Sequence, residues 1–103
     1  MKDDSLEITK QIQLARKYQK ERNIYQANEI YKKLINQKIF TYDLLFSYGQ
    51  FNKEINNLQI AKNLFILSVK KYPSKINSYI LLAEILRKEN KVNDALRILQ
   101  TAK

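Results

Sequence analysis

Few residues of this chain could carry acid–base, nucleophilic or metal chemistry. The 103 residues include no His and no Cys, which removes imidazole catalysis, thiol nucleophiles, disulfides and the usual zinc ligands. Asp3 and Asp4 are adjacent carboxylates, but they stand where a helix is expected to begin, and the helix dipole favours negative charge there. A single Gly excludes a Gly-rich phosphate-binding loop. We therefore expect no catalytic residue, no metal and no cofactor, and a protein that is not an enzyme.

The net charge and the apolar stretches of the chain indicate which classes of partner to expect. Nineteen Lys and Arg against ten Asp and Glu give a formal net charge of +9. Because the basic residues are spread over all the expected helices, nucleic acid is a poorly supported partner. No stretch approaches the roughly 20 apolar residues of a membrane-spanning helix, and the polar start is unlike a secretory signal. We expect a cytoplasmic protein without membrane contact.

Small residues recur with a period of 34 residues. When the sequence is written in rows of that length, all six Ala and the single Gly fall into three columns. The columns are Ala15, Gly49 and Ala83; Ala27, Ala61 and Ala95; and Leu34, Ser68 and Ala102. A fourth column holds larger apolar residues, namely Tyr31, Phe65 and Leu99. Helices approach closely only where side chains at the crossing are short, so the small columns predict contacts within three successive helical hairpins.

Local signals predict six helices and an all-α fold in one domain, residues 1–103. The helices are expected at about 4–21, 24–37, 41–55, 58–72, 75–90 and 92–102. Asp4, followed three residues later by Glu7, is typical of a capping box, and Pro73 is expected to end the fourth helix. Apolar residues recur at helical spacing, whereas strand-type alternation is nowhere sustained.

The columns resemble those of the tetratricopeptide repeat, a 34-residue helix–turn–helix unit. The resemblance covers residues 8–103, with repeats at about 8–41, 42–75 and 76–103. It implies a right-handed α-solenoid of three repeats. Where the family commonly has a turn Gly, this chain has Arg22, Asn56 and Asn90, which must then adopt a left-handed backbone.

The resemblance also implies a ligand-binding groove on the concave face, along the first helix of each repeat. Ile12, Phe46 and Ile80 form an apolar column that is expected to project there. The polar residues expected at its margins are Arg16, Gln19, Asp43, Gln50, Lys53, Asn77, Glu84 and Arg87. The apolar column would anchor a peptide, and the cations would favour an acidic one. The alternative is that the apolar column packs between neighbouring first helices.

The residues that would form the family's carboxylate clamp for chaperone tails are absent. Ile12, Arg16, Ser47, Asn77 and Leu81 stand in their places. A co-chaperone of that type is therefore not expected, and the groove would serve another protein or peptide.

Three functions stay open at this point. The favoured one is a protein-interaction or scaffolding module that binds a peptide or partner protein in the groove. The second is an N-terminal regulatory segment of a larger enzyme. The third is a self-assembling unit, because the third repeat lacks the polar capping helix usual in the family. Its exposed flank would then form an end-to-end interface through Leu96, Leu99 and Ala102.

Overall fold

The computed structural model describes residues 4–101, which form six helices and no strand. The helices are α1 (Asp4–Lys20), α2 (Ile24–Asn36), α3 (Tyr42–Glu54), α4 (Leu58–Lys71), α5 (Ile76–Lys88) and α6 (Val92–Thr101). Each begins and ends within two residues of the expected position, so the prediction of an all-α fold is confirmed. No helix in this part of the chain is both long and apolar enough to cross a membrane.

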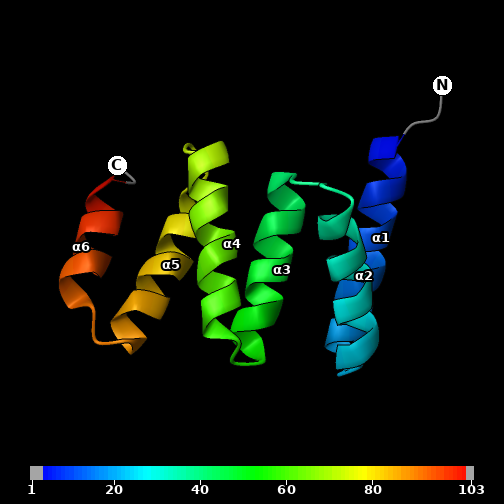
Figure 1. Ribbon diagram of the computed structural model, residues 1–103, viewed down its shortest axis with the longest axis horizontal. Helices are drawn as coiled ribbons and strands as arrows, with labels where there is room; N and C mark the ends of the chain where they lie inside the picture. The colour runs from blue at the N-terminus through cyan, green and yellow to red at the C-terminus, as the bar shows by residue number, and fades with distance from the viewer. Residues whose placement is uncertain (1–3, 102–103) are drawn as a thin grey trace.

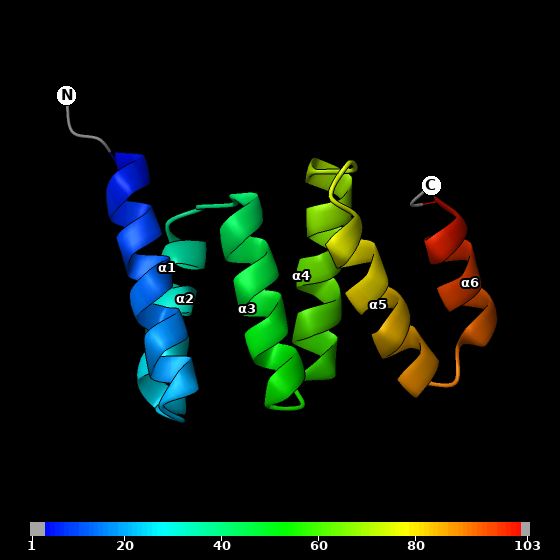
Figure 2. The same ribbon diagram turned by 180° about the vertical axis from the view of Figure 1, so that it is seen from behind.

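Successive helices run antiparallel and make three hairpins that lie side by side (Figure 1). The array measures 45 × 31 × 19 Å. Helix α1 packs on α2, α3 on α4 and α5 on α6, while α3 also contacts α1 and α2. The second hairpin meets the third mainly through α4 and α5. Seen from behind, α1 and α5 lie in front of α2 and α4, so Figure 2 looks onto the first helices of the hairpins.

The turn inside each hairpin is built in the same way. Its central residue has a left-handed backbone, with φ of 63° at Arg22, 66° at Asn56 and 62° at Asn90. The next residue donates its N–H to the carbonyl five positions earlier, at 2.8 Å in all three turns. The donor and acceptor pairs are Asn23 and Tyr18, Asn57 and Asn52, and Lys91 and Leu86. This bond closes a helix C-terminus in the Schellman manner, and the expected left-handed positions are confirmed.

The two connections between hairpins differ from each other. Lys38 has φ of 62°, and the following Ile39 donates its N–H to Leu34, so α2 ends in another left-handed turn. At the end of α4, Tyr72 has φ of −131° and precedes Pro73, which has no N–H to continue a helix. The prediction that Pro73 ends this helix is confirmed.

The start of α3 is capped, whereas the cap expected for α1 falls outside the described structure. The side chain of Thr41 accepts a hydrogen bond from the backbone N–H of Leu44 at 3.2 Å. Thr41 therefore caps α3, although it was expected to be the first helical residue. Asp4 is the first residue of α1, but its side chain and Asp3 lie outside the part of the molecule that the structure describes.

The small residues lie where helices touch. Ala15, Ala27, Ala61 and Ala83 are fully buried, and Ala95 is 3% exposed. A Cβ atom added to Gly49 would lie 2.6 Å from Cε1 of Phe65, which is closer than real Cβ contacts allow. Because Gly49 of α3 has no side chain, Phe65 of α4 can pack directly against the backbone of α3. Ala102 and the side chain of Leu99 are not among the described parts of the chain.

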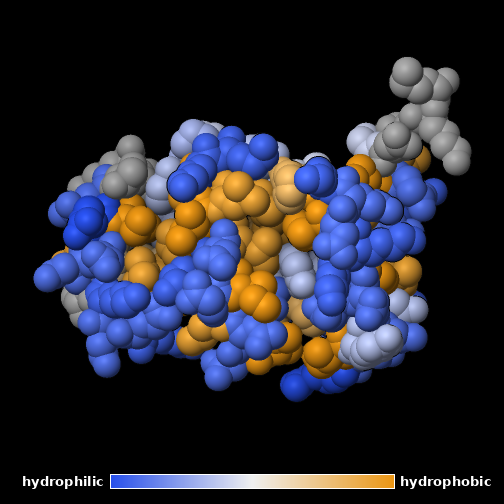
Figure 3. All heavy atoms as spheres, in the orientation of Figure 1, coloured by the Kyte–Doolittle hydropathy of each residue, from blue (hydrophilic) through white to orange (hydrophobic). Residues whose placement is uncertain are grey.

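The core divides into two clusters. The first joins α1, α2 and α3 with Leu64 of α4, and it is rich in aromatic rings, including Tyr31, Tyr48 and Phe51. The second joins α4, α5 and α6 around Phe65 and Leu82. On the face of the molecule shown in Figure 3, hydrophobic residues (orange) gather over the middle of the array, between hydrophilic residues (blue) on either side.

A candidate binding face formed by the first helices

Two polar columns of the sequence line two hollows on the face formed by α1, α3 and α5, which we call the first-helix face. The first column contains Arg16, Gln50 and Glu84, and the second contains Gln19, Lys53 and Arg87. A hollow of about 240 Å³ is lined by Arg16, Gln19, Lys20, Tyr31, Ser47, Gln50 and Glu54. A second, of about 410 Å³, is lined by Lys53, Glu84, Arg87 and Lys88. Every member of the two columns therefore borders one of these hollows.

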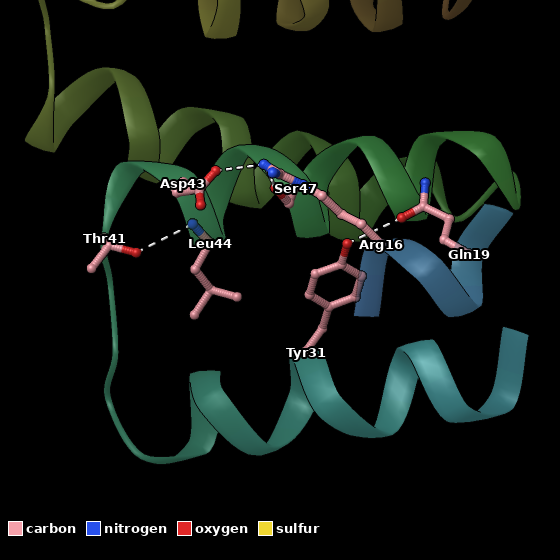
Figure 4. A network of polar contacts seen from close by, with 7 residues as sticks. All are labelled: Arg16, Gln19, Tyr31, Thr41, Asp43, Leu44 and Ser47. Carbon is pink, nitrogen blue, oxygen red and sulfur yellow. Dashed lines mark hydrogen bonds and ion pairs between the residues drawn. The ribbon is translucent and has the colours of Figure 1, made fainter. Parts of the chain in front are cut away.

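At the first hollow, Arg16 is held by residues of the next hairpin (Figure 4). Its Nη2 donates to Oδ1 of Asp43, and its Nε donates to Oγ of Ser47 at 3.0 Å. Ser47 is 2% exposed, so Arg16 also satisfies a buried hydroxyl. Arg16 and Asp43 are about half exposed, where an ion pair contributes at most about 1 kcal/mol. Arg16 thus fixes the first hairpin to the second and keeps part of its charge accessible.

A buried tyrosine forms the base of the same hollow. The hydroxyl of Tyr31 donates to Oε1 of Gln19 at 3.1 Å, and Nε2 of Gln19 donates to Oε1 of Glu54 at 2.6 Å. Burial raises the pKa of Tyr31 to about 12, since the phenolate would lose its hydration. Tyr31 therefore stays a neutral hydrogen-bond donor at physiological pH.

The second hollow is strongly cationic. Nζ of Lys53 lies 2.9 Å from Oε2 of Glu84, and this ion pair links α3 to α5. Arg87 and Lys88 are exposed and form no ion pair with any residue that the structure describes. Three cations thus surround one carboxylate, and two of them are open to an anionic group from another molecule.

The apolar column does not form an open ladder. Ile12 is 1% exposed and belongs to the first core cluster, so the expectation that it projects into a groove is wrong. Phe46 is half-buried, with its ring stacked on Tyr42 at 5.5 Å and 6.0 Å from the ring of Phe65. Ile80 is 41% exposed. The second hairpin covers Ile12, whereas no hairpin among residues 4–101 packs over Ile80, so the column marks packing between hairpins.

The remaining predicted groove residues, Asp43 and Asn77, do not lie together. Asp43 is engaged by Arg16, as described above. Asn77 is exposed at the start of α5 beside Ile76, which is 51% exposed, and it lines neither hollow. On α6 of the same hairpin, Leu96 is 53% exposed, in line with the prediction that this flank is uncovered.

Sequence reasoning missed several residues that line the hollows. Glu54 lies one turn after Gln50 on the same helix, so helical spacing alone could have indicated it. Lys20 and Lys88 each follow a predicted residue directly. Ser47 directly follows the predicted Phe46 and lies one turn after Asp43, so the same signals apply to it. Its role as the partner of Arg16 could not be predicted, because it depends on how α1 and α3 align.

Other hollows do not follow the 34-residue columns. Two neighbouring hollows lie along α1 and α2, within the first hairpin, and share Gln11, Ile30, Lys33 and Gln37. Another, of about 230 Å³, lies between α4, α5 and α6 and has Leu82 and Leu86 among its lining residues. The residues described contain no group of three or more Asp and Glu placed to hold a metal ion.

Comparison with models of known protein families and with curated proteins gives no match for this sequence. The function of this chain therefore has to be inferred from the six-helix array and the polar first-helix face.

Proposed function

We propose that this chain is a right-handed α-solenoid of three tetratricopeptide-like repeats and that it binds an extended, acidic segment of another protein along the first-helix face. One observation carries the proposal: all six residues of the two 34-spaced polar columns line the two hollows of this face. The repeat assignment is supported by the three turns, whose left-handed residues and hydrogen bonds also recur every 34 residues.

The lining of the hollows determines the chemistry of the partner. Because Ile12 is buried and Phe46 is packed against Tyr42, the face has no open apolar ladder to anchor large apolar side chains. Cations outnumber carboxylates instead: one hollow has Lys20 and the accessible part of Arg16 beside Glu54, and the other has Lys53, Arg87 and Lys88 beside Glu84. Carboxylates of the partner would approach these groups, and Gln50 would bond to its backbone.

Exposed charges of this kind give weak and salt-sensitive binding. Individual exposed ion pairs contribute about 0.2–1 kcal/mol, and salt screens them. An extended segment that reaches both hollows would add the contributions of several pairs. We therefore expect affinity to depend on contacts at both hollows and to fall as ionic strength rises.

The test uses a short, fluorescein-labelled peptide of alternating Glu and Ser, with binding followed by fluorescence anisotropy. Lys20→Glu and Lys88→Glu each reverse one charge, at the first and second hollow respectively, and should each weaken binding about three- to tenfold. Lys70→Glu is the matched control, since Lys70 is exposed on α4 and lines neither hollow. It should change affinity less than about twofold.

Two outcomes would contradict the proposal. If Lys70→Glu weakens binding as much as Lys88→Glu, attraction is spread over the whole basic chain and the first-helix face is not the site. If neither Lys20→Glu nor Lys88→Glu changes the affinity, the hollows take no part in binding.

A further inference from the structure

The flank of the last hairpin, which we call the α5–α6 flank and define by Ile80, Arg87 and Leu96, exposes two apolar side chains and a cation. Ile80 is 41% exposed, Leu96 is 53% exposed, and Arg87 is also exposed. We propose that this flank docks an amphipathic helix of a partner protein that presents a carboxylate to Arg87 and apolar side chains to Ile80 and Leu96.

The contacts between the first and second hairpins and between the second and third show which residues of a following hairpin each position of the flank would meet. At the position of Leu96, one hairpin earlier, Lys62 pairs with Glu89 at 2.9 Å, just beyond the end of α5. One hairpin earlier again, Asn28 accepts a hydrogen bond from the hydroxyl of Tyr48 on α3 at 3.2 Å. Both residues therefore contact the following hairpin. Leu96 is the apolar member of this column, and it faces the place where a following helix would lie.

Arg87 occupies the column that binds a carboxylate of the following first helix. Gln19 donates to Glu54 of α3 at 2.6 Å, and Lys53 pairs with Glu84 of α5 at 2.9 Å. Arg87 is the next member of the column, and among the described residues it has no ion-pair partner. The flank therefore continues an interface that the molecule uses twice, and the charge of Arg87 favours a helix that presents a carboxylate to it.

A second copy of this chain is a poor occupant. Docked head to tail, its α1 would take the place of a following first helix. At the positions of Glu54 and Glu84 in that helix, α1 carries Lys20 and Arg16, so cations would face Arg87. The residues of α1 at the positions of the fully buried Leu44 and Leu45 are Lys10 and Gln11. This surface suits water better than an interface.

The probe is a stapled synthetic helix with the sequence of α5, residues 76–88. Within the molecule α5 already docks on the equivalent flank of the second hairpin, and it presents Glu84 to Lys53. Binding of the labelled helix to the whole chain is measured by anisotropy. Leu96→Glu should weaken it about tenfold or more, since it places a carboxylate on the apolar part of the flank.

Two controls separate this flank from other surfaces. Ile60→Glu makes the same kind of change at an apolar side chain of α4 that is 45% exposed, and it should leave binding unchanged. Arg87→Glu should weaken binding by about tenfold, and a probe helix with Glu84→Lys should restore it, because the charges are then exchanged. Lys20→Glu, which tests the first-helix face, should not affect this probe, so the two proposals can fail separately.

Three results would overturn the inference. The first is equal affinity for the wild-type chain and Leu96→Glu, and the second is failure of the exchanged charges to restore binding. The third is a concentration-dependent dimer in sedimentation that Leu96→Glu dissociates, since a second copy would then occupy the flank.

Discussion

The first two hairpins place an aromatic ring at equivalent positions and accommodate it differently. Tyr31 in α2 stacks on Tyr48 at 5.2 Å, and its hydroxyl reaches the first-helix face, where it bonds to Gln19. Phe65 in α4 has no polar atom and lies directly against Gly49 of α3. The residue of the first hairpin that corresponds to Gly49 is Ala15. The 34-residue period thus determines where a large ring and a small residue lie, whereas the hydrogen bonds that the ring makes differ from one hairpin to the next.

The largest expected effect comes from removing the ring of the second hairpin. Phe65→Ala should lower the free energy of unfolding by about 3–5 kcal/mol, because Gly49 opposite has no side chain that could fill the cavity. Urea denaturation followed by circular dichroism measures this loss. If the variant is unfolded from the start, Phe65→Leu gives a smaller loss of about 1–2 kcal/mol that can be measured.

The control for this prediction is Ile60→Ala on the same helix. Ile60 is 45% exposed, so its truncation should cost well under about 1 kcal/mol. A loss for Phe65→Ala no larger than that of Ile60→Ala would mean that the ring does not organise the second hairpin.

The next largest effect is a loss of stability at alkaline pH that comes from Tyr31 in the first hairpin. The pKa of Tyr31 is about 12 in the folded chain and about 10 in an unfolded one. Between these values the unfolded chain loses the proton while the folded chain keeps it. The contribution of Tyr31 to the free energy of unfolding is therefore fully present below pH 10. It falls by on the order of 2–3 kcal/mol as the pH rises to 12.

Tyr31→Phe should remove this part of the alkaline loss, and urea unfolding at a series of pH values from 8 to 12 would measure it. Burial also raises the pKa of Tyr48, so the informative quantity is the difference between wild type and variant. Parallel pH profiles would show that the environment of Tyr31 does not discriminate between phenol and phenolate.

The contact between Gly49 and Phe65 can be tested in the opposite direction, by adding a methyl group. Gly49→Ala gains about 1 kcal/mol of helix propensity but forces the ring to move, at a cost of about 1–3 kcal/mol. We expect a net loss of about 1 kcal/mol. In the Phe65→Leu background the smaller side chain should relieve the clash, so the same substitution should become neutral or stabilising.

Ala15→Gly is the matched change in the first hairpin. It removes a buried methyl group and helix propensity together, and it should cost about 1–2 kcal/mol. Urea denaturation of the wild type, Gly49→Ala, Phe65→Leu and the double variant gives the coupling energy between positions 49 and 65. If Gly49→Ala stabilises the wild-type chain, the close approach of α4 to α3 is not specified by this glycine.

The parts of the structure that follow from local chemistry could be predicted from sequence. Helix ends depend on neighbours a few residues apart, as at Pro73, and the left-handed turns depend on the position of Arg22 and its equivalents in the period. The small columns were predictable as well, since a residue such as Gly49 in a helix has few other uses.

The candidate site depended on how hairpins sit against one another, and there the sequence was a weaker guide. Ile12 and Ile80 belong to one column, yet one is buried and the other exposed, because only the first has a hairpin packed over it. The partners of Arg16 lie on α3, and no local pattern indicates that α1 and α3 align so that Asp43 and Ser47 both reach it. Both outcomes depend on the angle and offset between hairpins, which a period does not specify.

The smallest expected effect concerns the turns of the same two hairpins. Arg22 and Asn56 have nearly the same φ, 63° and 66°, but a left-handed backbone costs most L-residues about 1–2 kcal/mol, whereas Asn tolerates it through local hydrogen bonds. Glycine removes that cost and adds about 0.5–1 kcal/mol of chain entropy to be lost on folding. Arg22→Gly should therefore stabilise the chain by about 0.5 kcal/mol, while Asn56→Gly should be neutral or slightly destabilising. Paired urea titrations of the two variants resolve this difference if their denaturant slopes agree. An equal gain from both would mean that Asn56 is as strained as Arg22, so the turn geometry alone, and not the residue placed in it, would set the stability of these hairpins.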